Sequence, residues 1–338
     1  MRIAQVATLS APVRATSGGS VESLVWLLTR ELAQLGHEVT VFGTAGSEAA
    51  GEVVVTQPGP YAQDGALEDW HLAEWVNLGR AIQQSHRFDV IHSHAYLWGL
   101  PLDPLSKAPL IHTTHIVPDD DSAKLWTAFP SARVTAISHF QWSAFPHLQP
   151  VACIPHGVDT EQFGFQAQPE DYLLYLGRFV SGKGPLVAID VARQLGIKLW
   201  LAGPSNPYFR ERVLPLVDNQ LIHYAGYVTG AERTRLLGGA RALVYPIQYP
   251  EAFGLVLVEA MLCGTPIAAM RLGAVPEIVE ENVSGFTTDN RQEFATLIPR
   301  CFGLDRFAIR QRALERFSAQ KMAAAYAGLY EQTAARSS

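Results

Sequence analysis

The sequence has little charge, and neither sign is concentrated anywhere along it. Only 17% of its 338 residues are Asp, Glu, Lys or Arg, and the formal net charge is −6. There is no run of Lys or Arg, so the chain lacks the basic face that attracts nucleic acid or an anionic membrane. We therefore expect no nucleic acid partner and no association with a membrane.

Cysteines and uninterrupted apolar runs are also scarce. The three cysteines (Cys153, Cys263 and Cys301) are far apart and odd in number, which indicates reduced, mostly buried thiols rather than a disulfide framework or a metal site. The first residues, MRIAQVATLS, are too short and too polar a stretch for a signal peptide. Glu259 interrupts the run that comes closest to a membrane span. These features predict a soluble, cytoplasmic protein.

What the sequence does contain is enough apolar material for two domains. It is 48% hydrophobic, and 338 residues exceed the ~250–300 at which single cores stop growing. Short apolar runs typical of buried strands alternate with helical patterns, in two series separated by FGFQAQPED (163–171). The predicted strands are Ile3–Ala7, Val39–Phe42, Val53–Val55, Val90–His92, Leu110–His112, Val134–Ile137 and Val151–Ile154, then Tyr172–Leu176, Leu199–Ala202, Leu221–Tyr224, Ala242–Tyr245 and Ile267–Ala269.

This alternation predicts an α/β fold of two doubly wound, Rossmann-like domains, each with a parallel sheet covered on both faces. We assign residues 1–165 to the first domain and 166–312 to the second. Ligands of open α/β sheets bind outside the carboxyl ends of the strands. We therefore expect the ligand in a cleft across which the two domains face each other.

Two glycine-containing loops suggest anion binding. Gly18 and Gly19 precede the first helix, where a backbone can approach a phosphate or carboxylate closely; an ordinary flexible turn is the alternative. GRFVSGKG (177–184) nearly matches the phosphate loop G-x-x-x-x-G-K-[ST], but Gly184 replaces the hydroxyl that holds Mg²⁺. The remaining cations, Arg178 and Lys183, suit a diphosphate bound without metal, or are a solvated surface pair.

Two other polar clusters raise the question of a metal. His92 and His94 are alternate residues of a strand and share a face, so both could ligate a metal. No further ligand set is evident nearby, and an H-x-H pair more often packs and forms hydrogen bonds. Three adjacent acids at 119–121 are usually solvated. We predict no metal site.

The stretch PEAFGLVLVEAMLCGTPI (250–267) carries two acids around an apolar run. Glu251 lies in the loop before a predicted helix, and Glu259 falls about one turn inside it. The N–H groups of Phe253, Gly254 and Leu255 would form an anion site at the helix start. Carboxylates are good acceptors for sugar hydroxyls, so the two acids would bind polyol groups on either side of a charge-neutralised diphosphate.

The pattern Glu251-x₇-Glu259, with Arg178 and Lys183 upstream, resembles the family 4 retaining glycosyltransferases of the GT-B fold. The resemblance covers nearly the whole chain, and the ordered set of motifs is specific. The matching stretches are GGS, GHEVTVFG (36–43), FDVIHSH (88–94), AISHF (136–140), IPHGVD (154–159), LGR…KG (176–184), LAGP (201–204), AGYV (225–228), PEAFGLVLVEAMLCGTPI and GAVPEIV (273–279).

The resemblance implies a role for each matching residue toward a nucleotide-sugar donor. Arg178 and Lys183 would hold the diphosphate, Glu259 the ribose, and Glu251 the sugar beside the amides of Phe253, Gly254 and Leu255. The backbone of Tyr227 and Val228 would meet the base. His115 would lie near the reacting sugar, and the loop of Gly18 and Gly19 would close on the phosphates.

The resemblance also has a structural consequence and two departures. The family's final helix crosses back to the first domain, and the candidate is 313–332. The family commonly has Asn where this chain has His156, which we interpret as a changed turn. The loop between Arg178 and Lys183 carries Ser181-Gly182.

We therefore expect a metal-independent, retaining transfer of a hexosyl group to an acceptor hydroxyl, driven mainly by electrostatic stabilisation of the leaving diphosphate. No cofactor is implied beyond the donor itself, for which a UDP-hexose is slightly favoured. A sugar-nucleotide epimerase of the same fold and a non-catalytic nucleotide-sugar-binding protein are the alternatives.

The acceptor is expected on the first domain. Trp98 and Trp126 follow two strands of that domain, and flat aromatic faces bury the apolar faces of sugars or ring-containing groups. His94 lies at one of these strand ends. The stretch 65–82 carries three acids against Arg80, whereas a membrane-bound acceptor would favour a basic amphipathic helix. The sequence therefore predicts a soluble small-molecule or glycan acceptor in contact with His94, Trp98 or Trp126.

Overall fold

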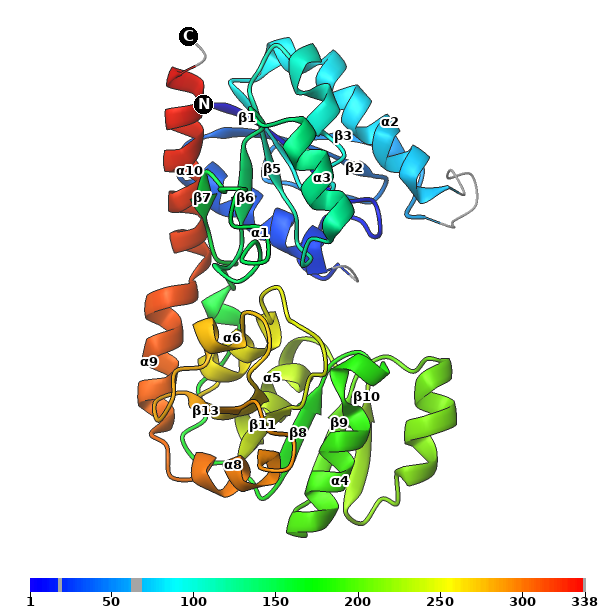
Figure 1. The fold of residues 1–338 in the computed structure, drawn as a ribbon, viewed down its shortest axis with the longest axis vertical. Coiled ribbons are helices and arrows are strands. Elements are labelled where there is room, and N and C mark those ends of the chain that lie inside the picture. Colours follow the sequence, from blue (N-terminus) through cyan, green and yellow to red (C-terminus); the bar gives the residue numbers. More distant parts are fainter. Residues whose placement is uncertain (18–19, 62–68, 337–338) are drawn as a thin grey trace. The chain divides into compact units, whose positions relative to one another are not determined.

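The computed structural model describes residues 1–17, 20–61 and 69–336 (Figure 1). Contacts between residues divide the chain into two compact units. The N-terminal unit contains Met1–Gly157 together with Ala319–Ser338, and the C-terminal unit contains Val158–Ser318. The division thus falls before the predicted boundary at residue 165, and the end of the chain belongs to the first unit.

Each unit is built on one parallel sheet. The strands are β1 (Arg2–Val6), β2 (Glu38–Thr44), β3 (Glu52–Gln57), β4 (Val90–Ser93), β5 (Leu110–Thr113), β6 (Val134–Ala136), β7 (Ala152–Cys153), β8 (Leu173–Leu176), β9 (Leu199–Ala202), β10 (Ile222–Gly226), β11 (Ala242–Tyr245), β12 (Ile267–Met270) and β13 (Gly285–Thr288). The helices are α1 (Ser20–Gln34), α2 (Trp70–Gln83), α3 (Asp120–Ala128), α4 (Pro185–Leu195), α5 (Gly230–Gly239), α6 (Leu255–Leu262), α7 (Val275–Ile278), α8 (Phe294–Cys301), α9 (Arg306–Phe317) and α10 (Ala319–Ala335).

The strand order places a topological switch point in each sheet. The seven strands of the N-terminal unit run β3-β2-β1-β4-β5-β6-β7, and the six of the C-terminal unit run β10-β9-β8-β11-β12-β13. The order reverses between β1 and β4 in one sheet and between β8 and β11 in the other. The predicted fold class of two doubly wound α/β units is confirmed, and the crevice at each switch point is where such sheets bind ligands.

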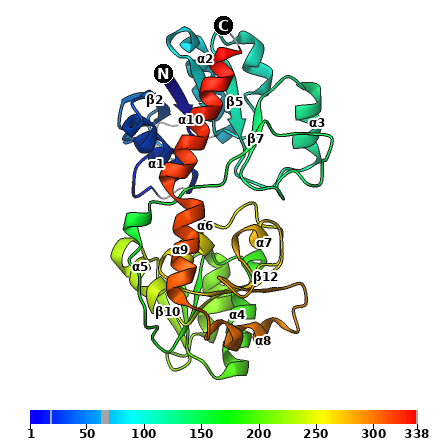
Figure 2. The ribbon, with the colours of Figure 1, turned by 90° about the vertical axis from the view of Figure 1, so that its left-hand side faces the viewer.

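Helices cover both faces of the first sheet because its strands alternate their side chains. Ile3 packs in one core with Leu28 of α1 and Tyr326 of α10, whereas the next residue, Ala4, packs in another with Leu78 of α2. Figure 2 shows α10 lying across one face of this unit, and α10 packs against α1. In the described part of the chain no helix combines the length and apolar character needed to cross a membrane.

Two features of the chain's last third differ from the prediction. The single helix predicted over 313–332 is two helices, because Ser318 has extended backbone (φ −71°, ψ 149°) and ends α9. Only α10 packs on the N-terminal unit, while α9 belongs to the C-terminal unit. Strand β13 was not predicted, since its sequence GFTT lacks a hydrophobic run.

Candidate active site

The loop after β8 is shaped by Gly184. This residue has φ 71° and immediately precedes α4, and a Cβ on it would lie 2.1 Å from the carbonyl oxygen of Pro246. The position at which a phosphate loop has Ser or Thr therefore requires glycine here, both for its left-handed backbone and for the close approach of the loop after β11. The approach brings Lys183 next to that second loop.

Lys183 meets Glu251 directly. The Lys183 ammonium contacts the Glu251 carboxylate and lies 3.2 Å from the Tyr245 hydroxyl, which also donates to Glu251. The ammonium is 5.2 Å from the ring centroid of Tyr249. The two charged side chains are only 16% and 15% exposed. Burial, and then the nearby Glu251 charge, hold the pKa of Tyr245 well above its usual value. Tyr245 therefore stays protonated and donates a hydrogen bond to Glu251.

The backbone of Glu251 is held by the GAVPEIV motif. Glu251 forms a β-bridge with Gly273, and the Ala274 N–H donates to the Glu251 carbonyl at 2.8 Å. Gly273 has φ 67°, and a Cβ on it would lie 2.2 Å from the Glu251 nitrogen. These contacts fix the position from which the Glu251 carboxylate reaches Lys183.

The start of α6 presents main-chain N–H groups. Gly254, in the left-handed region at φ 101°, precedes the helix and has no side chain with which to cap it. The first N–H groups of a helix have no partner within it, so the amides of Gly254 and Leu255 remain suited to an anion. The Phe253 side chain is buried against Phe317, so only its backbone can serve a ligand.

Glu259 is paired with a residue that sequence reasoning missed. Its carboxylate accepts from the Nε of Arg233 at 3.0 Å and from a terminal nitrogen of the same guanidinium. Arg233 lies in α5, after β10, and no motif marks it in the sequence. The pairing offsets the charge of a partly buried acid and sets where its oxygens point.

The other predicted donor residues differ in exposure. Arg178 is exposed, and among the described residues its guanidinium has no carboxylate partner; its backbone carbonyl accepts from the Tyr175 hydroxyl at 2.9 Å. Tyr227 is 60% exposed, whereas Val228 is 1% exposed, so Val228 can offer only its backbone to a base. Gly18 and Gly19 lie outside the described residues.

Two buried acids that were not predicted hold the loop that follows β1. Glu22 accepts from the Thr8 hydroxyl at 2.7 Å and from Ser10. Glu74, on α2, accepts from the Leu9 N–H at 2.8 Å and from the Tyr61 hydroxyl. Both carboxylates therefore bind at the carboxyl end of β1, on one side of the switch point.

The histidines at the ends of β4 and β5 bind protein groups. The ring nitrogens of His92 lie 2.6 Å from the Tyr330 hydroxyl and 2.7 Å from that of Thr113, and those of His94 lie 2.8 Å from Gln5 and 3.0 Å from His115. The H-x-H pair thus packs and forms hydrogen bonds, the alternative that the sequence favoured. The described ranges contain no group of three or more His, Cys, Asp or Glu that could hold a metal.

The adjacent acids 119–121 have a structural role at their first residue. Asp119 caps α3 by accepting from the Ser122 N–H at 2.8 Å. The Ser122 hydroxyl, which donates to Asp119 at 2.7 Å, and then this N–H keep the pKa of Asp119 below its usual value. The cluster is otherwise exposed, as expected for solvated acids.

The two candidate acceptor tryptophans have different environments. Trp98 is partly buried in an aromatic cluster, 5.0 Å from the ring of Trp70 and 4.9 Å from that of Tyr96. Trp126 is 3% exposed and packs edge-on against Trp142 in the core. The prediction that Trp126 contacts an acceptor is therefore wrong, because the apolar face of α3 buries it.

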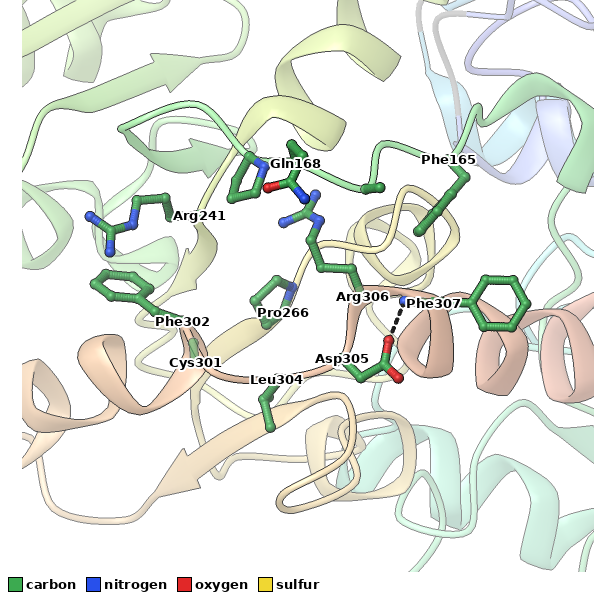
Figure 3. Close-up of a pocket in the computed structure, with 12 residues that line it drawn as sticks. Phe165, Gln168, Arg241, Pro266, Cys301, Phe302, Leu304, Asp305, Arg306 and Phe307 are labelled. Carbon is green, nitrogen blue, oxygen red and sulfur yellow. Dashed lines mark hydrogen bonds between the residues drawn. The ribbon is translucent and has the colours of Figure 1, made fainter.

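A hollow of about 490 Å³ in the C-terminal unit is not this site. Pro169, Arg241 and Pro266 line it, and they precede β8, β11 and β12, so it opens at the amino edge of the sheet (Figure 3). Arg306 in its wall donates to three backbone carbonyls, those of residues 166, 238 and 240. Arg306 therefore has a structural role, because it links backbone segments that are far apart in the sequence.

Comparison with known proteins places both units in one class of enzyme. The family model described as Glycosyltransferase Family 4 matches residues 18–162, and that described as Glycosyl transferases group 1 matches residues 159–302. Together they cover most of the chain. A D-inositol 3-phosphate glycosyltransferase from Pseudarthrobacter chlorophenolicus is 25% identical, over 85% of this chain and 83% of its own.

Solved structures share the fold over nearly the full length. Sucrose-phosphate synthase from Thermosynechococcus elongatus has a TM-score of 0.82 at 20% identity, covering 99% of this chain and all of its own. Anabaena HepE in complex with UDP-glucose has a TM-score of 0.73 at 19% identity, covering 98% of this chain and all of its own. With the two matched domains, these findings show that the chain belongs to the family 4 type glycosyltransferases of the GT-B fold, and that it is a hexosyltransferase that binds a nucleotide-sugar donor.

Proposed function

We propose that the protein is a retaining, metal-independent glycosyltransferase that moves a hexosyl group from a UDP-hexose to a hydroxyl of a soluble acceptor. The observation that carries the proposal is the meeting of Lys183 and Glu251 beside the switch point of the C-terminal unit. One is suited to a diphosphate and the other to sugar hydroxyls, and in a nucleotide-sugar these two groups are covalently adjacent.

Donor binding would exchange the partners of this ion pair. The diphosphate takes Lys183, and hydroxyls of the sugar replace the ammonium at Glu251. Tyr245, which touches both, stays within reach of either group. Arg178, exposed at the start of the same loop, adds a second cation, and the N–H groups at the start of α6 supply a third source of positive potential. These groups stabilise the charge that develops on the departing diphosphate.

Metal independence is supported by the loop itself. The hydroxyl that would hold Mg²⁺ is replaced by Gly184, and a side chain at that position would collide with Pro246. We expect EDTA to leave transfer activity essentially intact. Complete loss of activity that Mn²⁺ or Mg²⁺ restores would overturn this part of the proposal.

The donor base is proposed as uracil. The family resemblance favours UDP-hexoses slightly, and the structurally similar HepE was solved with UDP-glucose. A thermal-shift panel of UDP-, GDP- and ADP-sugars tests this, since a ligand at 100 times its Kd should stabilise the fold by ~2.7 kcal/mol. We expect the UDP-sugars to give the largest shift. A shift only with GDP- or ADP-sugars would contradict the choice of base.

Retention and transfer are tested on the product. With the donor identified, the anomeric configuration of the product bond should match that of the donor, as NMR of the purified product would show. Inversion would contradict the proposed stereochemistry. Conversion of the donor sugar without any acceptor would instead indicate an epimerase.

The acceptor is proposed to contact Trp98; His94 is buried and both of its ring nitrogens bind protein groups, so it is left out of this contact. The Trp70–Tyr96–Trp98 cluster offers partly exposed aromatic faces at the end of β4, next to the loop that Glu22 and Glu74 hold. Such surfaces recognise the apolar faces of rings and their hydroxyls. We expect Trp98→Ala to raise the acceptor KM. An unchanged acceptor KM would count against this placement, and Trp75→Ala, on the outer face of α2, is the matched control.

The same face of α2 tests whether the acceptor is soluble. Leu72, Trp75 and Val76 are 56%, 43% and 39% exposed there. Glu74, one of the acids that argued against membrane binding, is buried and contributes no surface charge. We expect no co-sedimentation with anionic liposomes. Co-sedimentation of the wild type that Trp75→Ser abolishes would overturn the proposal of a soluble acceptor.

A further inference from the structure

A continuous chain of buried hydrogen bonds links the C-terminal helix to His115. All its members belong to the N-terminal unit, and they come from β1, β4, β5, β6, the segment after β7, and α10. Each ring or side chain in it binds one neighbour on either side along the chain, and Thr113 also lies 3.3 Å from the Tyr326 hydroxyl. Because a backbone carbonyl lies at one end, the donor of every bond can be assigned.

The first half of the chain starts at the carbonyl of His112. A carbonyl only accepts, so the Thr135 hydroxyl, 3.4 Å away, donates to it. The Thr113 hydroxyl must then donate to Thr135, and His92 must donate from Nε2 to Thr113, at 2.7 Å. The Nδ1 of His92 is left to accept from the Tyr330 hydroxyl, at 2.6 Å.

The second half continues in the same sense. Since the Tyr330 hydroxyl donates its hydrogen bond to His92, its oxygen accepts from the Nε2 of Gln5 at 3.1 Å, and the Gln5 oxygen accepts from the Nε2 of His94 at 2.8 Å. The Nδ1 of His94 accepts from the Nε2 of His115 at 3.0 Å. The Nδ1 of His115 accepts from the Nε2 of His156 at 3.1 Å.

We propose that His94, His156 and Tyr330 are positioning residues for His115, and that the chain they form holds its ring neutral with the single proton on Nε2. A second proton on His94 or His115 would place an N–H against the N–H of the next ring, so the geometry itself opposes charge there. The lowered pKa values agree: burial brings that of His115 to about 4 and holds those of His92, His94 and His156 well below the usual value.

The consequence is a defined chemistry for His115, which rests on the proposed function. Its Nδ1 already accepts a hydrogen bond from the Nε2–H of His156, so the ring is not available there as a base. Its Nε2–H can turn from His94 to a substrate oxygen as a neutral donor. His156, which stands where the family commonly has Asn, keeps this arrangement because both side chains carry an N–H that can donate to Nδ1.

The proton positions are tested by NMR of full-length protein with ¹⁵N-labelled histidine, without any substrate. We expect N–N couplings across two hydrogen bonds, from Nε2 of His156 to Nδ1 of His115 and from Nε2 of His115 to Nδ1 of His94. Tyr330→Phe should abolish them or make the tautomers mixed. Tyr326→Phe removes a buried hydroxyl of the same helix that contacts the chain only at its two threonines, 3.3 Å from Thr113, and should leave the couplings unchanged. A proton on Nδ1 of His115, or equal effects of the two variants, would overturn the proposal.

Activity provides the second readout. We expect His156→Asn to keep kcat within about threefold of the wild type. His156→Leu, which has no donor, should lower kcat roughly 10- to 100-fold with the donor KM unchanged, the range seen when the partner that orients a functional histidine is removed elsewhere. Equal kcat in both variants would refute the positioning role. A wild-type protein that transfers no sugar would refute the proposed function instead, while the couplings would still decide the proton positions.

Discussion

At the scale of single residues, the ion pair between Lys183 and Glu251 shows how a donor site is arranged before its ligand arrives. Two opposite charges of low exposure are costly to leave alone, so each serves as the partner of the other. A ligand that carries both a negative and a hydroxyl-rich group can replace both partners at once. A diphosphate or a sugar alone would leave one charge without a partner, which favours the complete nucleotide-sugar.

The cations should matter more for turnover than for folding. We expect Lys183→Ala and Arg178→Ala each to lower kcat by roughly 10²–10³, as the loss of one donor to a developing charge does in other enzymes. Lys198→Ala, which removes an exposed lysine near the amino end of β9, is the control and should have no effect. Steady-state kinetics measures all three. Wild-type kcat in both loop variants would show that these cations do not stabilise the transition state.

Glu74 should make stability depend on pH. Burial raises its pKa from 4.5 to about 7, and within the described residues its second oxygen has no hydrogen-bond partner. Above pH 4.5 the unfolded chain releases this proton while the folded protein retains it, so this carboxyl costs stability as pH rises toward 7. Glu74→Gln cannot titrate, so its stability relative to the wild type should increase between pH 4.5 and 7 by up to roughly 3 kcal/mol.

Urea unfolding of the two proteins at a series of pH values measures this difference. Glu22→Gln is the control, because it also removes a buried acid, one that accepts three hydrogen bonds. The comparison separates the pH effect expected of Glu74 from the general effect of removing a buried acid. A difference between Glu74→Gln and the wild type that stays constant over the pH range would contradict the prediction.

At the scale of elements, the sequence predicted most strands because those of a parallel sheet are short, continuous apolar runs. It failed where that signal was absent, as in β13, or where a helical pattern continued across a break, as at Ser318 between α9 and α10. Loops were predicted as ligand-binding from glycines and charges. The partners of the two acids in these loops were not predicted. Tyr245 and Arg233 lie on other elements, and only the folded chain brings them to Glu251 and Glu259.

The histidines illustrate the same limit. The sequence showed His92 and His94 on one face of a strand and left metal binding or hydrogen bonding open. Tyr330, which decides the matter, lies more than 200 residues further along and belongs to a helix predicted at slightly different bounds. Local spacing can state what a pair of side chains is able to bind. It cannot show which distant residue forms hydrogen bonds with those side chains.

The two ends of α4 allow a prediction about its glycines. Gly184 before the helix and Gly196 after it both have left-handed backbone, with φ 71° and 65°. A Cβ on Gly196 would meet nothing within 4 Å, whereas one on Gly184 would collide with Pro246. Gly196→Ala should therefore cost about 1 kcal/mol for the strained φ alone. Gly184→Ala should cost clearly more and also lower donor affinity, because the Lys183 loop must move.

Thermal unfolding with and without UDP-sugar measures both effects. Equal destabilisation by the two substitutions would mean that the loop relaxes freely around Pro246. In that case the fixed position of Lys183, and with it the argument that Gly184 is required, would fail.

At the scale of the whole molecule, the buried histidines concentrate acid sensitivity in one unit. His92, His94, His115 and His156 all belong to the N-terminal unit, and burial lowers the pKa of each, for His115 to about 4. The unfolded chain binds protons at these rings below about pH 6.5, where the folded unit does not. Their contribution to stability is therefore complete above pH 6.5 and is lost as pH falls toward 4.

The N-terminal unit should accordingly unfold first in acid. As pH falls within this window, each histidine lowers the free energy of unfolding by up to about 1.4 kcal/mol per pH unit. The four together therefore outweigh the opposite effect of Glu74. Six of the seven tryptophans lie in this unit, and only Trp200 lies in the other, so tryptophan fluorescence reports mainly on it. Between pH 7 and 5 we expect the urea midpoint seen by fluorescence to fall. Hydrogen exchange should show amides of β1, β4 and β5 losing protection before those of β8, β11 and β12. The reverse order would show that the four histidines gain protons without unfolding the unit that buries them.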